Sequence, residues 1–99
     1  MSNPAVNPYN ATLSMDTQNT EYSYTFPLNV KRIFYKLRDQ GNDLRVSWTS
    51  GVVANSNGPY MTLWAGATNT IDQIDSGAQI TLYFATGVDN QVLELEIWT

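Results

Sequence analysis

From about residue 20 onward, apolar and polar side chains alternate along most of the chain, which is the period of a strand with one buried face. The alternation is clearest at Ile33, Tyr35 and Leu37, and again at Leu93 and Leu95. It recurs in segments 22–26, 44–49, 61–65 and 80–85. No comparable segment has a helical period. The pattern therefore predicts an all-β chain of half-buried strands.

Runs of Gly, Asn, Asp, Ser and Pro separate these segments, and residues 40–43 are predicted to form a short hairpin turn. A weaker strand over 11–15 brings the expected number of strands to about seven. Residues 66–78 are the least regular and are predicted to form a loop anchored by Ile71 and Ile74. The spacing of strands and turns indicates a single antiparallel β-sandwich, either jelly-roll or immunoglobulin-like.

The N-terminal segment has a different composition, with Pro4, Pro8 and several Asn but few large apolar residues. Because a residue before proline is pushed toward extended conformations, we expect an extended arm from Met1 to about Tyr9. Such an arm is either a frayed terminus or a segment that docks on a neighbouring subunit. The expected organisation is an arm and weak first strand over 1–19, followed by a β-sandwich domain over 20–99.

A length of 99 residues suits one domain, and the chain contains no Cys and no His. The composition excludes disulfides, thiolate or imidazole metal ligands and the usual general base of a serine triad. We therefore expect a protein that is not an enzyme, with no catalytic, cofactor-binding or metal-binding residues assigned. No apolar stretch approaches the length of a membrane helix and the N-terminus lacks signal-peptide features, so we also expect no membrane partner.

Charge is sparse, at 14% of residues, and unevenly distributed. The stretch from Lys31 to Arg45 contains all five basic residues and two acids, for a net +3, whereas the other seven acids give the rest of the chain −7. Segregation of this kind can attract nucleic acid or match two faces of neighbouring subunits. In an acidic protein of pI about 4.3, we favour subunit contacts and consider nucleic acid an unlikely partner.

Two predicted strands supply candidate interface residues. Arg32, Phe34, Lys36 and Arg38 share one side of a strand, a basic stripe with one aromatic ring that single-strand nucleic-acid binders also use. Glu94 and Glu96 share a strand face at a separation that general acid and base pairs can adopt, although an interface or solvated face is favoured. We expect these acids to pair with the basic stripe, either within the fold or across an interface.

Two further sets of residues have alternative interpretations. Asp72 and Asp75 could offer oxygen ligands to calcium, but their spacing favours an ordinary polar loop. Trp48 shares its predicted face with apolar residues and is interpreted as core. Trp64 and Trp98 share theirs with polar residues and are the better candidates for an exposed patch, covered by a sugar or by a neighbouring protein.

Segments Lys36–Asp39, Leu44–Gly51, Ile80–Ala85 and Leu93–Trp98 together resemble small all-β virion structural proteins of tailed bacteriophages, of the capsid decoration or cement type. The resemblance covers roughly residues 26–99 and rests on the pattern of strands. It implies a non-enzymatic protein on the capsid surface, made in the host cytoplasm and bound to the major capsid protein. It also implies a homo-oligomer, for which we favour a trimer. The alternative is a carbohydrate- or receptor-binding module of a phage tail, with Trp64 and Trp98 as stacking surfaces.

Overall fold

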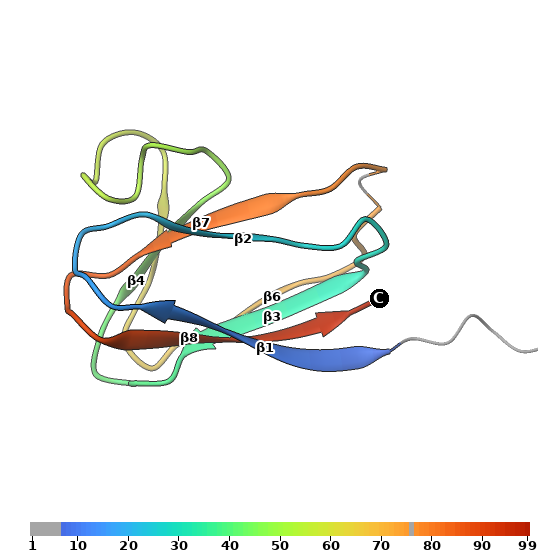
Figure 1. Ribbon diagram of the computed structural model, residues 1–99, viewed down its shortest axis with the longest axis horizontal. Helices are drawn as coiled ribbons and strands as arrows, with labels where there is room; N and C mark the ends of the chain where they lie inside the picture. The colour runs from blue at the N-terminus through green and yellow to red at the C-terminus, as the bar shows by residue number, and fades with distance from the viewer. Residues whose placement is uncertain (1–6, 76) are drawn as a thin grey trace, which may run out of the picture.

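The computed structural model describes residues 7–75 and 77–99 (Figure 1). Within these residues the chain forms eight strands and no helix. The described part of the chain thus contains no helix that is long and apolar enough to cross a membrane. The strands are β1 (Pro8–Met15), β2 (Tyr22–Thr25), β3 (Arg32–Leu37), β4 (Leu44–Ser47), β5 (Met61–Leu63), β6 (Asn69–Ile71), β7 (Thr81–Ala85) and β8 (Gln91–Trp98).

The strands form two four-stranded sheets, one in the order β1-β8-β3-β6 and the other in the order β2-β7-β4-β5. Every neighbouring pair is antiparallel, so the prediction of an all-β antiparallel fold is confirmed. The predicted number of strands was wrong, because β6 lies inside the expected loop 66–78. Three residues are too few for an alternating pattern to be recognised, and β6 is defined only by its pairing with β3.

Consecutive strands lie in different sheets, so the connections between them cross from one sheet to the other. The exception among the eight described strands is the pair β4 and β5, which are neighbours in the same sheet. The predicted hairpin turn at 40–43 was therefore wrong: it joins β3 in one sheet to β4 in the other. The Asp39 carboxylate accepts a hydrogen bond from the Gly41 N–H at 2.9 Å. Turn chemistry of this kind bends the chain without determining which strand comes to lie beside which.

A single apolar core is built from residues of both sheets. The alternation predicted for β3 and β8 is confirmed, because buried and partly exposed residues alternate along both strands. The ring of Tyr35 on β3 meets the ring of Phe84 on β7 edge to face, with centroids 5.5 Å apart. The buried residues of the core are Met15, Phe26, Val30, Ile33, Tyr35, Leu37, Leu44, Val46, Leu82, Phe84, Leu93, Leu95 and Ile97.

The first strand, β1, pairs with the last strand, β8, over its whole length, from Pro8 opposite Trp98 to Met15 opposite Gln91. The predicted weak strand over 11–15 lies within β1, and the predicted arm over 1–9 overlaps it at Pro8 and Tyr9. Asn7 of that arm exchanges backbone hydrogen bonds with Thr99, and residues 1–6 lie outside the described residues. The division of the chain into segments 1–19 and 20–99 stays a prediction.

Tyr35 and Asn69 provide a test of how β6 is attached to the sheet. The Asn69 side-chain amide donates a hydrogen bond to the buried Tyr35 hydroxyl at 2.8 Å. We expect Tyr35→Phe to lower the free energy of unfolding by about 1 kcal/mol, because a part-buried amide loses its partner. Urea unfolding of Tyr35→Phe, Asn69→Ala and the double variant would measure the coupling energy. Fully additive effects of the two substitutions would contradict this role for the hydrogen bond.

Candidate functional site

The structure brings together seven of the eight predicted interface residues on the outer face of the β1-β8-β3-β6 sheet. Arg32 lies opposite Trp98, Phe34 opposite Glu96, and Lys36 opposite Glu94 in the β3–β8 register. Arg38 follows directly after β3. We call this set the charged face: Arg32, Phe34, Lys36, Arg38, Glu94, Glu96 and Trp98. The eighth residue, Trp64, follows β5 in the other sheet.

Glu94 is the centre of the ionic contacts on the charged face. Its carboxylate accepts a hydrogen bond from Arg38 Nε at 2.9 Å and lies 3.5 Å from Lys36 Nζ. The hydrogen bond from Arg38 is the main cause that lowers the pKa of Glu94 below its ordinary value of 4.5, with the charges of both cations acting in the same direction. The expected pairing of basic and acidic strands is thus found within the fold.

A second set of contacts links the remaining residues of the charged face. The Trp98 indole N–H donates to a Glu96 carboxylate oxygen at 2.9 Å. The Arg32 guanidinium lies 5.8 Å from the centroid of the Trp98 ring, within the range of a cation–π contact. Trp98 is half-buried, and the Arg32 guanidinium already lies over its ring. Its indole is therefore not a free stacking surface for a sugar.

A shallow hollow of about 370 Å³ crosses the charged face between β1 and β3. Its lining includes Phe34, Lys36, Glu94 and Glu96 of the charged face, and Asn10 and Thr12 of β1. Both glutamates already accept hydrogen bonds from side chains of the same face. The hollow thus offers charges that are largely neutralised by one another, which limits its attraction for a strongly charged ligand.

Four exposed large apolar residues of the described chain lie just after β4 or in and next to β5, on the other sheet. The exposed fractions are 52% for Trp48, 36% for Tyr60, 56% for Met61 and 70% for Trp64. We call these four residues the aromatic surface. The interpretation of Trp48 as core was wrong, because β4 ends at Ser47 and the chain turns before the alternation reaches Trp48.

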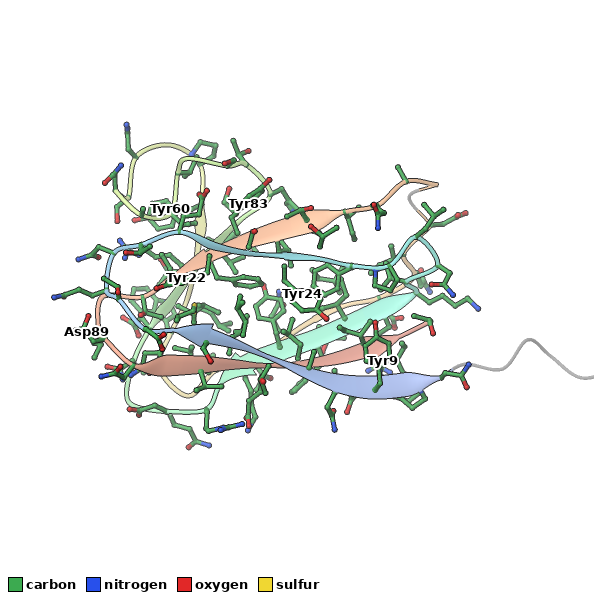
Figure 2. The ribbon with its side chains drawn as sticks, in the orientation of Figure 1. Tyr9, Tyr22, Tyr24, Tyr60, Tyr83 and Asp89 are labelled. Carbon is green, nitrogen blue, oxygen red and sulfur yellow. The ribbon has the colours of Figure 1, made fainter. Side chains whose placement is uncertain are left out.

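Tyr60 connects the two halves of the aromatic surface, and Figure 2 labels it beside the long loop after β4. With Trp48 and Met61 it lines a mainly apolar hollow of about 290 Å³. With Trp64 and Thr62 it lines a second hollow, of about 450 Å³. Aromatic residues and Met are enriched where proteins contact other proteins, and contiguous apolar patches commonly mark such sites.

Residues 48–60 form the long loop between β4 and β5, and the side chains of Glu21, just before β2, and Ser47, at the end of β4, hold it in place. The Glu21 carboxylate accepts hydrogen bonds from Ser50 Oγ at 3.0 Å and from the Gly51 N–H at 2.8 Å. At the other end, Ser47 Oγ donates to the Pro59 carbonyl oxygen at 2.9 Å. A fixed loop loses little conformational entropy when it binds, so the aromatic surface is presented ready for contact.

The loop is also packed from within. Val52 and Val53 of the loop are buried, and a Cβ atom on Gly58 would come within 3.2 Å of a Val52 methyl group. Gly58 has a φ of 111°, a backbone conformation that favours glycine. The positive φ thus favours glycine at this position, and a larger residue would also require the Val52 side chain to shift.

The hollow beside Trp64 combines the aromatic ring with polar groups. Arg45 donates hydrogen bonds to Asn19 Oδ1 at 2.7 Å and to Ser56 Oγ at 2.6 Å, which hold its guanidinium in place. Asp43 lines the same hollow and accepts a hydrogen bond from the Ala65 N–H at 2.7 Å. An exposed ring beside fixed polar groups can contact a flat apolar face of a ligand and its hydroxyl groups together.

The two aspartates considered as calcium ligands lie in the turn after β6. The Asp72 carboxylate accepts a hydrogen bond from the neighbouring Gln73 N–H at 2.8 Å. Across residues 7–75 and 77–99, no group of three or more Asp, Glu, His or Cys side chains could hold a metal ion. Comparisons with protein-family models, with curated proteins and with solved structures found no match for this chain.

Glu94 makes the stability of the charged face depend on pH. Because its pKa is lower in the folded chain than its ordinary value of 4.5, its contribution is complete above that value and disappears as the pH falls through the folded pKa. We expect Glu94→Gln to have a lower melting temperature than the wild type at pH 7 and an equal one well below pH 4.5. Thermal melts across this pH range would show it, and a difference independent of pH would contradict it.

Proposed function

We propose that this chain is a non-enzymatic structural protein of a phage virion, a decoration or cement protein that binds the major capsid protein and stabilises the shell. In this proposal the aromatic surface is the attachment site, and the protein acts on the capsid surface after synthesis in the host cytoplasm. The observation that carries the proposal is the cluster of Trp48, Tyr60, Met61 and Trp64, exposed together around a loop that is held in place.

The order of the strands supports this proposal. We infer that the two sheets pack as a sandwich with jelly-roll topology, because their orders, β1-β8-β3-β6 and β2-β7-β4-β5, follow the connectivity of an eight-stranded jelly roll. The contact between Tyr35 and Phe84 supports face-to-face packing of the sheets. Jelly rolls are common in viral capsid proteins and in lectins, which is an argument by analogy of fold.

The charges also favour attachment through apolar contacts. Lys36 and Arg38 already pair with Glu94, and Arg32 and Glu96 both contact Trp98, so each charged side chain of this face already has a partner within the chain. The aromatic surface, in contrast, leaves indole rings and a thioether in water, and covering them is favourable. A repeating shell would engage many copies at once, so that each contact can be modest while the whole layer is held firmly.

Binding of a carbohydrate or receptor is the second candidate, and the hollow beside Trp64 favours it. That hollow holds an exposed indole together with the fixed polar groups of Asp43 and Arg45. Trp64 and Trp98, the two expected stacking surfaces, are far from forming a common one, since Trp64 follows β5 and Trp98 ends β8 in the other sheet. A sugar site in this protein would therefore use Trp64 with Tyr60.

Attachment to the shell can be measured by co-sedimentation with capsids of the parent phage assembled without this protein. We expect Trp64→Ala to weaken binding by about 2 kcal/mol, roughly 30-fold, as for a central aromatic residue of an interface. The matched control is Leu28→Ala, which removes a side chain 61% exposed in the turn between β2 and β3 and should bind as the wild type does. Equal binding by all three proteins would reject the aromatic surface as the attachment site.

A glycan array separates the two candidate functions. We expect no glycan signal from the wild-type protein under conditions in which it co-sediments with capsids. A signal that is lost in Trp64→Ala and kept in Leu28→Ala, from a protein that ignores capsids, would replace the capsid proposal with the sugar site. Circular dichroism of both variants would verify that neither substitution unfolds the chain.

A further inference from the structure

We propose that β1 pairs with β1 of a second copy of this chain, so that the two β1-β8-β3-β6 sheets join into one continuous antiparallel sheet across a two-fold axis. The proposal concerns self-association and does not depend on what the aromatic surface binds. It rests on three features of β1: the direction of its unpaired backbone groups, the absence of the devices that normally protect an edge, and the self-complementarity of its side chains.

The hydrogen bonds at the end of the sheet define which backbone groups of β1 face outward. Asn7 and Thr99 bond each other in both directions, from the Asn7 N–H at 3.1 Å and from the Thr99 N–H at 3.4 Å. In an antiparallel pair, every second residue of a strand exchanges such bonds with its opposite residue. Since Asn7 is one of these residues, the backbone N–H and C=O groups of the odd-numbered residues of β1 point toward β8. The N–H and C=O groups of Asn10, Thr12 and Ser14 therefore point away from β8, at the open edge of the sheet.

This edge lacks the usual protection against pairing. β1 is eight residues long, outermost in its sheet among the described strands, and contains no charged residue. Proteins normally blunt such an edge with lysine, an inward charge, a bulge or a very short strand. The other outermost strand of the same sheet, β6, has three residues, as does β5, which is also preceded by Pro59. In β1 the sole comparable feature is Pro8, at its first position.

A two-fold axis at Thr12 gives β1 a self-complementary register. Thr12 then meets its own copy, and Asn10 meets Ser14 of the partner, each pair exchanging two backbone hydrogen bonds through the groups that face outward. The side chains of these three residues are exposed, small and polar, and cross-strand pairs of this kind are favourable. An isologous contact of this sort closes on itself and gives a dimer, in place of the trimer expected from the resemblance.

In the same register, apolar side chains on the other face of β1 are covered by those of the partner. Ala11 and Leu13 are half-buried at the edge of the core, and Tyr9 is 41% exposed near the N-terminal end of β1 (Figure 2). About Thr12, Ala11 lies beside Leu13 of the partner and Tyr9 beside Met15 of the partner. Covering Tyr9, Ala11 and Leu13, which are partly exposed in a single copy, adds a hydrophobic contribution to the backbone hydrogen bonds.

A single introduced cysteine tests both the β1 edge as the contact and the register about Thr12. The chain contains no other cysteine, so any disulfide must join two copies at the introduced position. Opposed residues of a hydrogen-bonded antiparallel pair have Cα atoms about 5.5 Å apart, within the range that a disulfide can span. We expect Thr12→Cys to form a covalent dimer under mild oxidation. The matched control, Ser23→Cys, places an exposed cysteine on β2, at the edge of the other sheet, and should remain mostly monomeric on a non-reducing gel. Crosslinking of Thr12→Cys no faster than that of Ser23→Cys would overturn the proposal.

Thr12→Pro provides the complementary test. Its ring removes an N–H that faces away from β8, a position at which an edge strand tolerates proline. We expect the wild-type protein to have twice the mass of the 11.1 kDa chain by light scattering, and Thr12→Pro to have the mass of one chain. A monomeric wild type or a dimeric Thr12→Pro would overturn the proposal, and the cysteine result decides it should the proline variant unfold. Capsid co-sedimentation of Thr12→Cys under reducing conditions reports separately on the proposed function.

Discussion

The edge-to-face contact between Tyr35 on β3 and Phe84 on β7 joins the two sheets within the apolar core, and the position of a third strand depends on the same tyrosine. Tyr35 is buried, yet its hydroxyl accepts a hydrogen bond from Asn69. Burial raises the pKa of Tyr35, so the hydroxyl stays neutral and can remain in the core without the cost of a buried charge. One side chain thus connects three strands: it belongs to β3, it packs on β7, and it holds the short strand β6 at the edge of its sheet.

This packing determines where polar side chains can lie. Since β3 and β8 direct alternate residues into the core, their other residues must share the outer face, and the register places Lys36 opposite Glu94. On the other sheet the chain leaves β4 at Ser47 and returns through Pro59, which Ser47 holds by a hydrogen bond. Trp48 therefore lies where the chain departs from the sheet, and Tyr60 where it returns. The exposed aromatic residues are a consequence of this long excursion.

The sequence predicted the alternating strands well, because a period of two is a local signal that each strand carries by itself. It could not predict strand order, which depends on contacts between distant residues: residues 40–43 look like a hairpin turn but connect different sheets. β6 was missed because three residues carry too little pattern. For the candidate site, the outward stripe from Arg32 to Arg38 and its pairing with Glu94 followed from alternation and charge. Trp48 was misplaced because alternation was extended one residue beyond the end of β4.

The charged face and the aromatic surface lie on different sheets. The segregation of +3 over residues 31–45 from −7 elsewhere suggested electrostatic attraction between subunits, but Lys36 and Arg38 engage Glu94 of the same chain. A pair already formed within a molecule must be broken before either charge can serve a partner, and exposed pairs of this kind yield little in exchange. Association therefore has to draw on groups that the fold leaves unsatisfied. Among the described residues, these groups include the rings and the thioether of the aromatic surface and the outward backbone groups of β1, which lie on different sheets. The proposed attachment and the proposed dimer contact therefore do not compete for the same surface.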